Sequence, residues 1–172
     1  MARLRSSALV VPTRGVRAAQ LPASAVDTIR GIAAGIERPF AVSHLSAALV
    51  MGMPVPRRFA SGLPVHVMRP TQRAQTHRPS VISHRGLERR RVVRVRGLPV
   101  VDPLDTWCDL ARMVPADELV VIGDWLMSRG ASTGDFVATL GAHGGERGIR
   151  AARGALPLIR AGSRSRMETL AR

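Results

Sequence analysis

The sequence of 172 residues contains no lysine, no asparagine and no tyrosine, and it has only three phenylalanines and two tryptophans. The three missing residues have AT-rich codons, so their absence indicates a GC-rich bacterial genome. A core must therefore be packed mainly by aliphatic side chains. The single cysteine, Cys108, excludes an internal disulfide and fits a reducing cytosol. No apolar run approaches the length of a membrane span and no secretory signal is evident, so we predict a cytoplasmic protein without a membrane partner.

Positive charge is abundant and unevenly distributed. All 26 basic residues are arginine, and the net charge is +14. Residues 1–100 hold 17 arginines against three acids, residues 101–146 hold two against eight, and residues 147–172 hold seven against one. Codon bias explains a preference for arginine over lysine, but it does not explain this zoning. A field of this size favours a polyanionic partner.

The hydrophobic pattern predicts an α+β protein. The stretch "ALVVPTRGV" predicts one or two strands, and two helices follow. Ser24 caps the first, with Asp27 at its third position, and Ser43 caps the second, which ends at Gly52. Short β-branched runs, "PVHVMRP" and "PSVISHRG", then predict strands, and "RRVVRVRGLPVVDP" predicts a half-buried strand whose polar face is made of guanidinium groups.

The helical period returns after Asp102, which caps a helix that has Pro103 at its first position. Two further helices are predicted in "ADELVVIGDWLMSRG" and "STGDFVATLGAHGG", the latter with a capping box of Ser132 and Asp135, and a last one in "RGIRAARGALPLIR" is broken at Pro157. The expected order is thus an N-terminal strand pair, two helices, a small β-sheet with a basic hairpin, and a helical C-terminal half.

The run "SHRGLERRRVVRVRG" is the strongest candidate for nucleic-acid contact. On a hairpin, alternate arginines would share one face and the three consecutive arginines would lie at the turn, where a basic ribbon can follow a phosphate backbone. The alternative is a solvated strand face in an arginine-rich proteome. Arg147, Arg150 and Arg153 lie three apart and could form a basic stripe on one side of a helix, but a solvated helix face fits them better. The predicted nucleic-acid-binding residues are Arg85, Arg89, Arg90, Arg91, Arg94 and Arg96.

No pattern predicts catalysis, a cofactor or a metal. The five histidines and Cys108 show no metal-ligand spacing, and nucleophile-elbow, Walker and dinucleotide motifs are absent. His44 is expected to pack or hydrogen-bond at the start of its helix. The carboxylates between Asp102 and Asp124 are interpreted mainly as helix caps and charges near helix N-termini.

Four blocks together carry a family resemblance: "FAVSHLSAALVMGMPVPRR", "PVHVMRP", "RGLPVVDPLDTWCDLAR" and "DELVVIGDWLMSRG". In this order they resemble actinobacterial AbiEi-type antitoxins of type IV toxin–antitoxin systems, over residues 14–172. The resemblance implies a DNA-associated transcriptional regulator that binds and represses a promoter. It also implies a toxin partner that is neutralised without a tight complex.

Both ends of the chain depart from that family. Residues 1–20 resemble only the wing strands of a winged helix-turn-helix, residues 21–160 resemble the α+β core, and residues 161–172 resemble the start of a nuclease domain similar to very-short-patch-repair endonucleases. Glu168 stands at the place of a metal-binding acid in that domain, but a chain without lysine has no Glu-x-Lys element. We therefore expect a truncated, non-enzymatic protein. The alternatives are the non-catalytic N-terminal part of an endonuclease-domain protein and an inert gene remnant.

Overall fold

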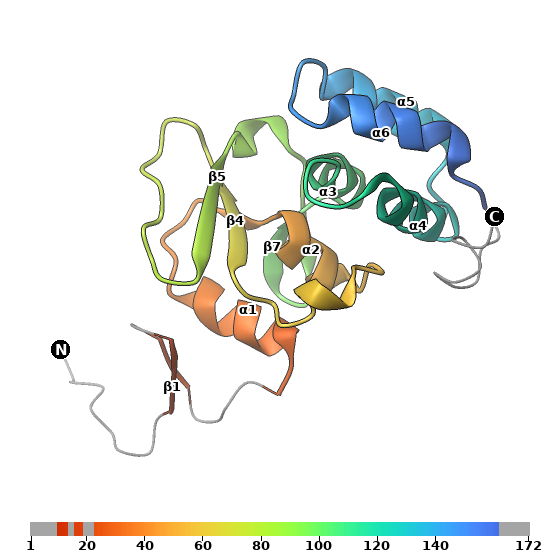
Figure 1. Ribbon diagram of the computed structural model, residues 1–172. Coiled ribbons are helices and arrows are strands. Elements are labelled where there is room, and N and C mark those ends of the chain that lie inside the picture. The colour runs from red at the N-terminus through yellow and green to blue at the C-terminus, as the bar shows by residue number, and fades with distance from the viewer. Residues whose placement is uncertain (1–9, 14–15, 19–22, 162–172) are drawn as a thin grey trace.

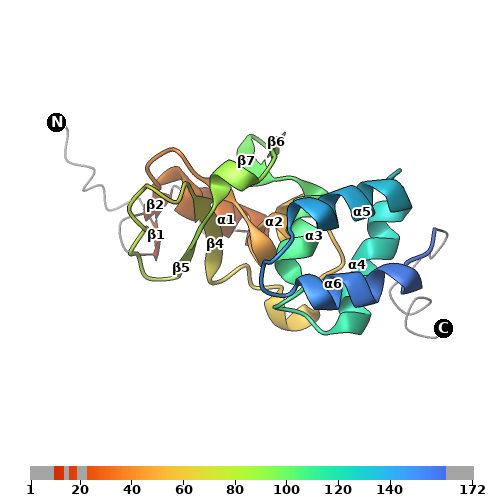
Figure 2. The same cartoon turned by 90° about the horizontal axis from the view of Figure 1, so that it is seen from above.

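The computed structural model describes residues 10–13, 16–18 and 23–161 of the chain. A small sheet and helix α1 occupy one half of the molecule, helices α3 to α6 occupy the other, and α2 lies between them (Figures 1 and 2). This arrangement of a mixed sheet beside a helical half confirms the α+β class. The segment 162–172 with Glu168, for which the start of a nuclease domain is expected, lies outside the described residues.

The N-terminal elements follow their local sequence signals. Strands β1 (Val10–Thr13) and β2 (Val16–Ala18) pair with each other in a two-stranded antiparallel sheet that is separate from the main sheet. Helix α1 (Ala25–Ala34) begins where the Ser24 hydroxyl accepts a hydrogen bond from the Asp27 amide at 3.1 Å. Its end at Gly35 precedes the proline that the sequence marks as a stop.

The main sheet has five strands in the order β5-β4-β3-β7-β6. The pairs β4–β5 and β3–β7 are parallel, whereas β3–β4 and β6–β7 are antiparallel. The central strand, β3, has only two residues and was not predicted, because a strand this short has no periodicity. The strands are β3 (Ala41–Val42), β4 (Val65–Arg69), β5 (Val81–Arg85), β6 (Val92–Val95) and β7 (Leu98–Val101).

The valine–arginine run forms a hairpin rather than the single strand predicted from its alternation. Strand β6 turns at Arg96 and Gly97, both with positive φ, and returns as the fully buried strand β7. Strands β5 and β6 lie at opposite edges of the sheet. The three consecutive arginines, residues 89–91, are therefore not at the hairpin turn. They lie in the connection from β5 to β6, which includes the 3₁₀ turn η2 (Leu87–Arg89).

Helix α2 (His44–Met51) contributes to two hydrophobic cores. Ala47 and Val50 pack with α1 and the sheet, whereas Leu45 and Ala48 pack with the helical half. A helix that is apolar on all sides is expected to be buried on all sides. The predicted C-terminal stop is confirmed because Gly52 adopts a left-handed conformation. Ser43 is the N-cap residue, as predicted, but its side chain makes no capping hydrogen bond.

The helical half packs around Trp107, which is fully buried. The indole N–H of Trp107 donates to the carbonyl oxygen of Leu119 at 2.9 Å, and Phe136 meets the ring edge-on. The predicted cap at Asp102 and the capping box of α5 are confirmed. The helices are α3 (Pro103–Leu110), α4 (Ala116–Met127), α5 (Thr133–Ala142) and α6 (Ile149–Ala155), followed by the 3₁₀ turn η3 (Leu156–Leu158), which contains Pro157. None of the helices in the described part of the chain has the length and apolar character needed to cross a membrane.

Candidate functional site: a histidine and arginine cleft

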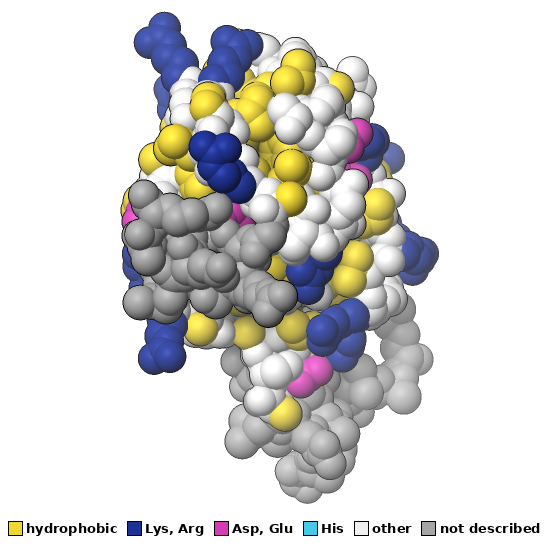
Figure 3. All heavy atoms as spheres, turned by 90° about the vertical axis from the view of Figure 1, so that its right-hand side faces the viewer, with side chains coloured by type: hydrophobic (Ala, Val, Ile, Leu, Met, Phe, Trp, Pro, Cys, Tyr) yellow, Lys and Arg dark blue, Asp and Glu magenta, His cyan; other side chains and the backbone are white. Residues whose placement is uncertain are grey.

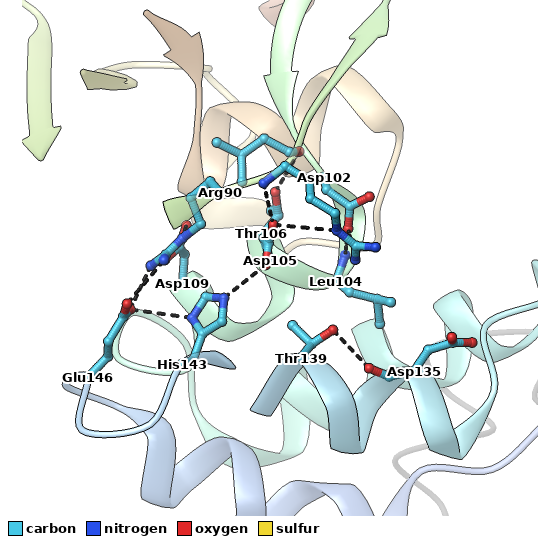
Figure 4. A network of polar contacts seen from close by, with 12 residues as sticks. Arg90, Asp102, Leu104, Asp105, Thr106, Asp109, Asp135, Thr139, His143 and Glu146 are labelled. Carbon is cyan, nitrogen blue, oxygen red and sulfur yellow. Dashed lines mark hydrogen bonds and ion pairs between the residues drawn. The ribbon is translucent and has the colours of Figure 1, made fainter. Parts of the chain in front are cut away.

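Arg90 joins the connection between β5 and β6 to the helical half through two carboxylates (Figure 4). Its guanidinium group contacts Asp109 at 2.7 Å and Glu146 at 2.6 Å, and each carboxylate accepts two hydrogen bonds from it. The side chains of Arg90 and Asp109 are only 6% and 5% exposed. Burial opposes the charge on Arg90, but the hydrogen bonds to Glu146 and Asp109 outweigh that effect and raise its pKa.

His143 extends this network towards α3. One ring nitrogen contacts Asp105 at 2.9 Å and the other contacts Glu146 at 3.3 Å, as Figure 4 shows. Asp105 also accepts a hydrogen bond from the Arg91 amide at 2.8 Å. Burial works against the charged form of Asp105, but these hydrogen bonds prevail and hold its pKa below the usual value. Asp105, His143, Glu146, Arg90 and Asp109 therefore form one continuous chain of polar contacts.

The interpretation of the acidic block as helix caps and charges near helix N-termini is confirmed for the positions of Asp105, Asp117 and Glu118, which lie in first helical turns, but it misses the tertiary contacts of this block. Asp102 does cap α3, but Asp105 and Asp109 are buried and hold partners from other elements. Asp124 is also buried and accepts a hydrogen bond from the backbone N–H of Arg160 at 2.7 Å. These carboxylates are used in tertiary packing, where buried charges require partners.

Three histidines, which are far apart in sequence, stack on one another beside this network. The rings of His44 and His84 lie 3.6 Å apart between centroids, and Nδ1 of His66 lies 3.0 Å from Nε2 of His84. Burial lowers the pKa of His66 and of His84 to about 4, and it lowers that of His44 well below its usual value. Neighbouring cationic groups, including Arg112, lower all three further, so the cluster is neutral at physiological pH.

The backbone at His44 adopts a conformation that L-residues seldom use. Its φ is 51°, in the left-handed region, which costs on the order of 1–3 kcal/mol for a residue other than glycine. Contacts with β4 fix this geometry: the Ser43 amide donates to the His66 carbonyl at 3.0 Å, and the His66 amide donates to the Ser46 hydroxyl at 2.8 Å. The buried His44 ring is thereby held against His84, with its Nδ1 bonded to the Ser43 hydroxyl at 3.1 Å.

Two groups of side chains could supply metal ligands, and both already make contacts within the protein. In the first, Nδ1 of His66 faces Nε2 of His84 at 3.0 Å and the His44 ring stacks on His84, so a metal ion would have to separate two ring nitrogens that already contact each other. Asp109, His143 and Glu146 also lie close together, but Arg90 occupies the space between two of them. A cation would have to displace that guanidinium group.

Histidines and arginines meet in a polar cleft of about 390 Å³. Its walls come from the start of α2, from β4 and β5, from the turn η2 and from the ends of two helical segments. The side chains of Arg85, Arg89, Arg112 and Arg147 are exposed at the cleft, whereas His44 is only 3% exposed. The lining residues are His44, Met68, Thr71, His84, Arg85, Gly86, Arg89, Arg90, Asp109, Arg112, Glu146 and Arg147.

The six arginines predicted to bind nucleic acid divide into separate groups. Arg85 and Arg89 line the cleft in exposed positions, and Arg90 lines it from within the ion-pair network. Arg91 is directed to Asp102 at 3.1 Å, with 65% of its side chain exposed. Arg94 and Arg96 lie on the β6–β7 hairpin. Strand β6 lies at the opposite edge of the sheet from β5, four strand spacings of about 4.8 Å away, which is roughly 19 Å.

The sequence did not predict that the histidines and Arg112 meet at one site. The expectation of a solvated helix face is wrong for Arg147, which precedes α6 and lines the cleft. Alternation along a strand did offer a signal, because His66 and Met68 on β4 share a face with Ile82 and His84 on the neighbouring parallel strand. By contrast, nothing local indicates that Arg112 and Arg147 reach the same cleft. Figure 3 shows a different face, formed by the helical end, where arginine side chains are spread singly among apolar and uncharged ones and no histidine is visible.

Comparison of the chain with protein-family models, with curated proteins and with solved structures finds no match. The resemblance to AbiEi-type antitoxins therefore stays a prediction from the sequence.

Proposed function

We propose that this protein is a DNA-associated regulator of the antitoxin class, and that it contacts the phosphate backbone through the arginines around the cleft. The observation that supports this proposal is the convergence of Arg85, Arg89, Arg112 and Arg147, from three separate segments of the chain, on one cleft. Guanidinium groups are the preferred partners of phosphate, because their planar fork can donate two parallel hydrogen bonds.

The charge balance of the cleft favours an anion. Its lining has five arginines against two carboxylates, Asp109 and Glu146, and Arg90 already neutralises part of the carboxylate charge. The nearby histidines are neutral, so they do not change this surplus of three positive charges. Phosphate contacts of this kind position a protein on DNA without reading its sequence. We therefore expect binding to duplex DNA with little sequence preference and a strong dependence on salt.

The test is fluorescence anisotropy with a labelled duplex at several salt concentrations. Replacing Arg85, Arg89 and Arg147 together by glutamine should weaken binding. It should also reduce the salt slope by about 0.9 for each phosphate that is no longer neutralised, so by about 2.7 if all three arginines bind phosphates. The matched control replaces Arg150, Arg153 and Arg160 by glutamine, because these exposed residues lie outside the cleft and the charge change is the same.

The control should keep the larger part of the salt slope. Equal losses of affinity in the two triple variants would show that net charge alone drives binding and would contradict an assignment to the cleft. An unchanged slope in the cleft variant, together with a reduced slope in an Arg94→Gln and Arg96→Gln variant, would place the DNA-binding surface on the β6–β7 hairpin instead.

A further inference from the structure

We infer that the cleft is a binding site for a phosphomonoester group, that is, a phosphate attached to its carrier by a single ester bond. This inference rests on the proposed function, because it gives the same arginines a more specific ligand. The two sources of such a group are a 5′-phosphorylated DNA end and a free nucleotide.

The shape of the cleft favours a terminal phosphate group. A duplex presents its diester phosphates on a convex surface, where they can lie across exposed arginines but cannot enter a hollow. A volume of about 390 Å³ falls within the range of pockets that take small molecules. A terminal phosphate, which protrudes from its carrier, can enter such a space and approach its inner wall.

The donors around the cleft match the number of oxygens on a phosphomonoester. A phosphomonoester has three terminal oxygens and a charge of about −1.5 to −2 at neutral pH. Arg89, Arg112 and Arg147 have exposed side chains that make no hydrogen bond or ion pair with any residue that the structure describes. Arg85 donates to the Thr71 carbonyl at 3.3 Å and to the side-chain oxygen of Gln75 at 3.0 Å, which leaves part of its guanidinium group for a ligand. A dianion with three terminal oxygens can accept hydrogen bonds from several of these guanidinium groups at once, whereas a diester has one negative charge and two free oxygens.

The inner wall of the cleft offers ring nitrogens to a ligand. His44 and His84 line the cleft, and each uses one ring nitrogen in a hydrogen-bonding contact, with Ser43 and His66 respectively. The second nitrogen of each ring has no hydrogen-bond partner within the described part of the chain. The lowered pKa of both rings keeps them neutral, and a neutral imidazole can offer an N–H to a phosphate oxygen. The residue with the left-handed backbone conformation, His44, is thus one of the residues that line this wall.

The experiment compares matched pairs of ligands. One arm measures the affinity for a DNA hairpin duplex with a single end, carrying either a 5′-phosphate or a 5′-hydroxyl. The other arm measures binding of deoxyadenosine 5′-monophosphate against deoxyadenosine by calorimetry. The phosphorylated member of at least one pair should bind about tenfold more tightly, as expected for one or two additional charge-assisted hydrogen bonds.

Three single variants locate the site. Arg112→Gln and His84→Gln should each remove most of the preference for the phosphorylated ligand. His77→Gln is the control, because His77 is an exposed histidine outside the cleft, and this variant should keep the full preference. Arg112 is exposed and makes no hydrogen bond with the described residues, so its replacement tests the site even if the His84 variant folds poorly.

The outcomes separate this inference from the proposed function. If the 5′-phosphate and 5′-hydroxyl forms of the DNA hairpin bind equally and the nucleotide binds no better than the nucleoside, the inference is overturned, while salt-dependent DNA binding can still stand. If the nucleotide binds in an Arg112-dependent manner and no duplex binds, the inference holds with the free nucleotide as its source, and the DNA-associated function fails. A phosphate preference that survives both Arg112→Gln and His84→Gln would overturn the assignment to this cleft.

Discussion

Replacing Arg90 by methionine should destabilise the protein far more than replacing its neighbour Arg91 in the same way. Arg90 is the partner of a carboxylate, Asp109, whose side chain is only 5% exposed. Removing one member of a buried ion pair costs about 3–5 kcal/mol, because an uncompensated charge stays behind. Arg91 pairs with Asp102 while 65% of its side chain is exposed, so its replacement should cost about 0–1 kcal/mol.

The difference in stability between Arg90→Met and Arg91→Met should become smaller as the pH falls. Burial already raises the pKa of Asp109, and the guanidinium group of Arg90 opposes that effect. Without Arg90, the folded-state pKa of Asp109 rises further above its unfolded value. An acid with a raised folded-state pKa increasingly destabilises the fold as the pH rises above its unfolded-state pKa, and the effect is complete above the folded-state pKa. The loss in free energy of unfolding caused by Arg90→Met should therefore be largest near pH 7 and should decrease as the pH falls towards 4.

Urea denaturation monitored by tryptophan fluorescence measures both effects. At pH 7 the free energies of unfolding of the two variants should differ by about 3 kcal/mol, which corresponds to roughly 6–12 °C in melting temperature for a chain of this size. Adding Asp109→Leu to Arg90→Met should recover a large part of the stability, since an apolar pair can replace a buried ion pair. Equal stabilities of Arg90→Met and Arg91→Met at pH 7 would refute this reasoning.

Two further predictions concern a close backbone approach and the thiol. Gly148 has a φ of 90°, and a β-carbon there would lie 3.0 Å from the backbone nitrogen of Arg112, so Gly148→Ala should lower the free energy of unfolding by about 1–2 kcal/mol. Gly154→Ala, within α6 and in open space, should instead raise it by about 0.5–1 kcal/mol, and a destabilisation there as large as at Gly148 would contradict the argument. Cys108 is buried and its pKa is raised to about 12, so a disulfide reagent at pH 8 should label it slowly in the native protein and rapidly in denaturant. Rapid labelling of the native protein would show that the thiol is accessible.

Features encoded by neighbouring residues were predictable from the sequence. The capping box of Ser132 and Asp135, the cap at Asp102 and the left-handed stop at Gly52 each depend on residues close together in the chain, so side-chain type and spacing are sufficient. The α+β class also follows from the change in period along the chain. These local signals located every α-helix of the described residues.

The candidate site was not predictable in the same way, because its contacts are tertiary. Arg90 and Glu146 are 56 positions apart, and Asp105 and His143 are 38 apart. A charged residue in the middle of a basic run looks solvated in the sequence, and only the fold shows that Arg90 points inward. Likewise, no spacing rule relates His44 to His84, since the order of the strands brings them together.

The position of α2 has a consequence for how the molecule holds together. Since one side of this helix completes the core under the sheet and another side completes the core of the helical half, neither half has a complete interior without it. We therefore expect that two fragments divided at the boundary between sheet and helices would not each fold alone. Removal of α2 from either core exposes apolar surface in both, so the two halves should open as a single cooperative unit. The cleft is built across this boundary, and its geometry thus depends on the integrity of both halves.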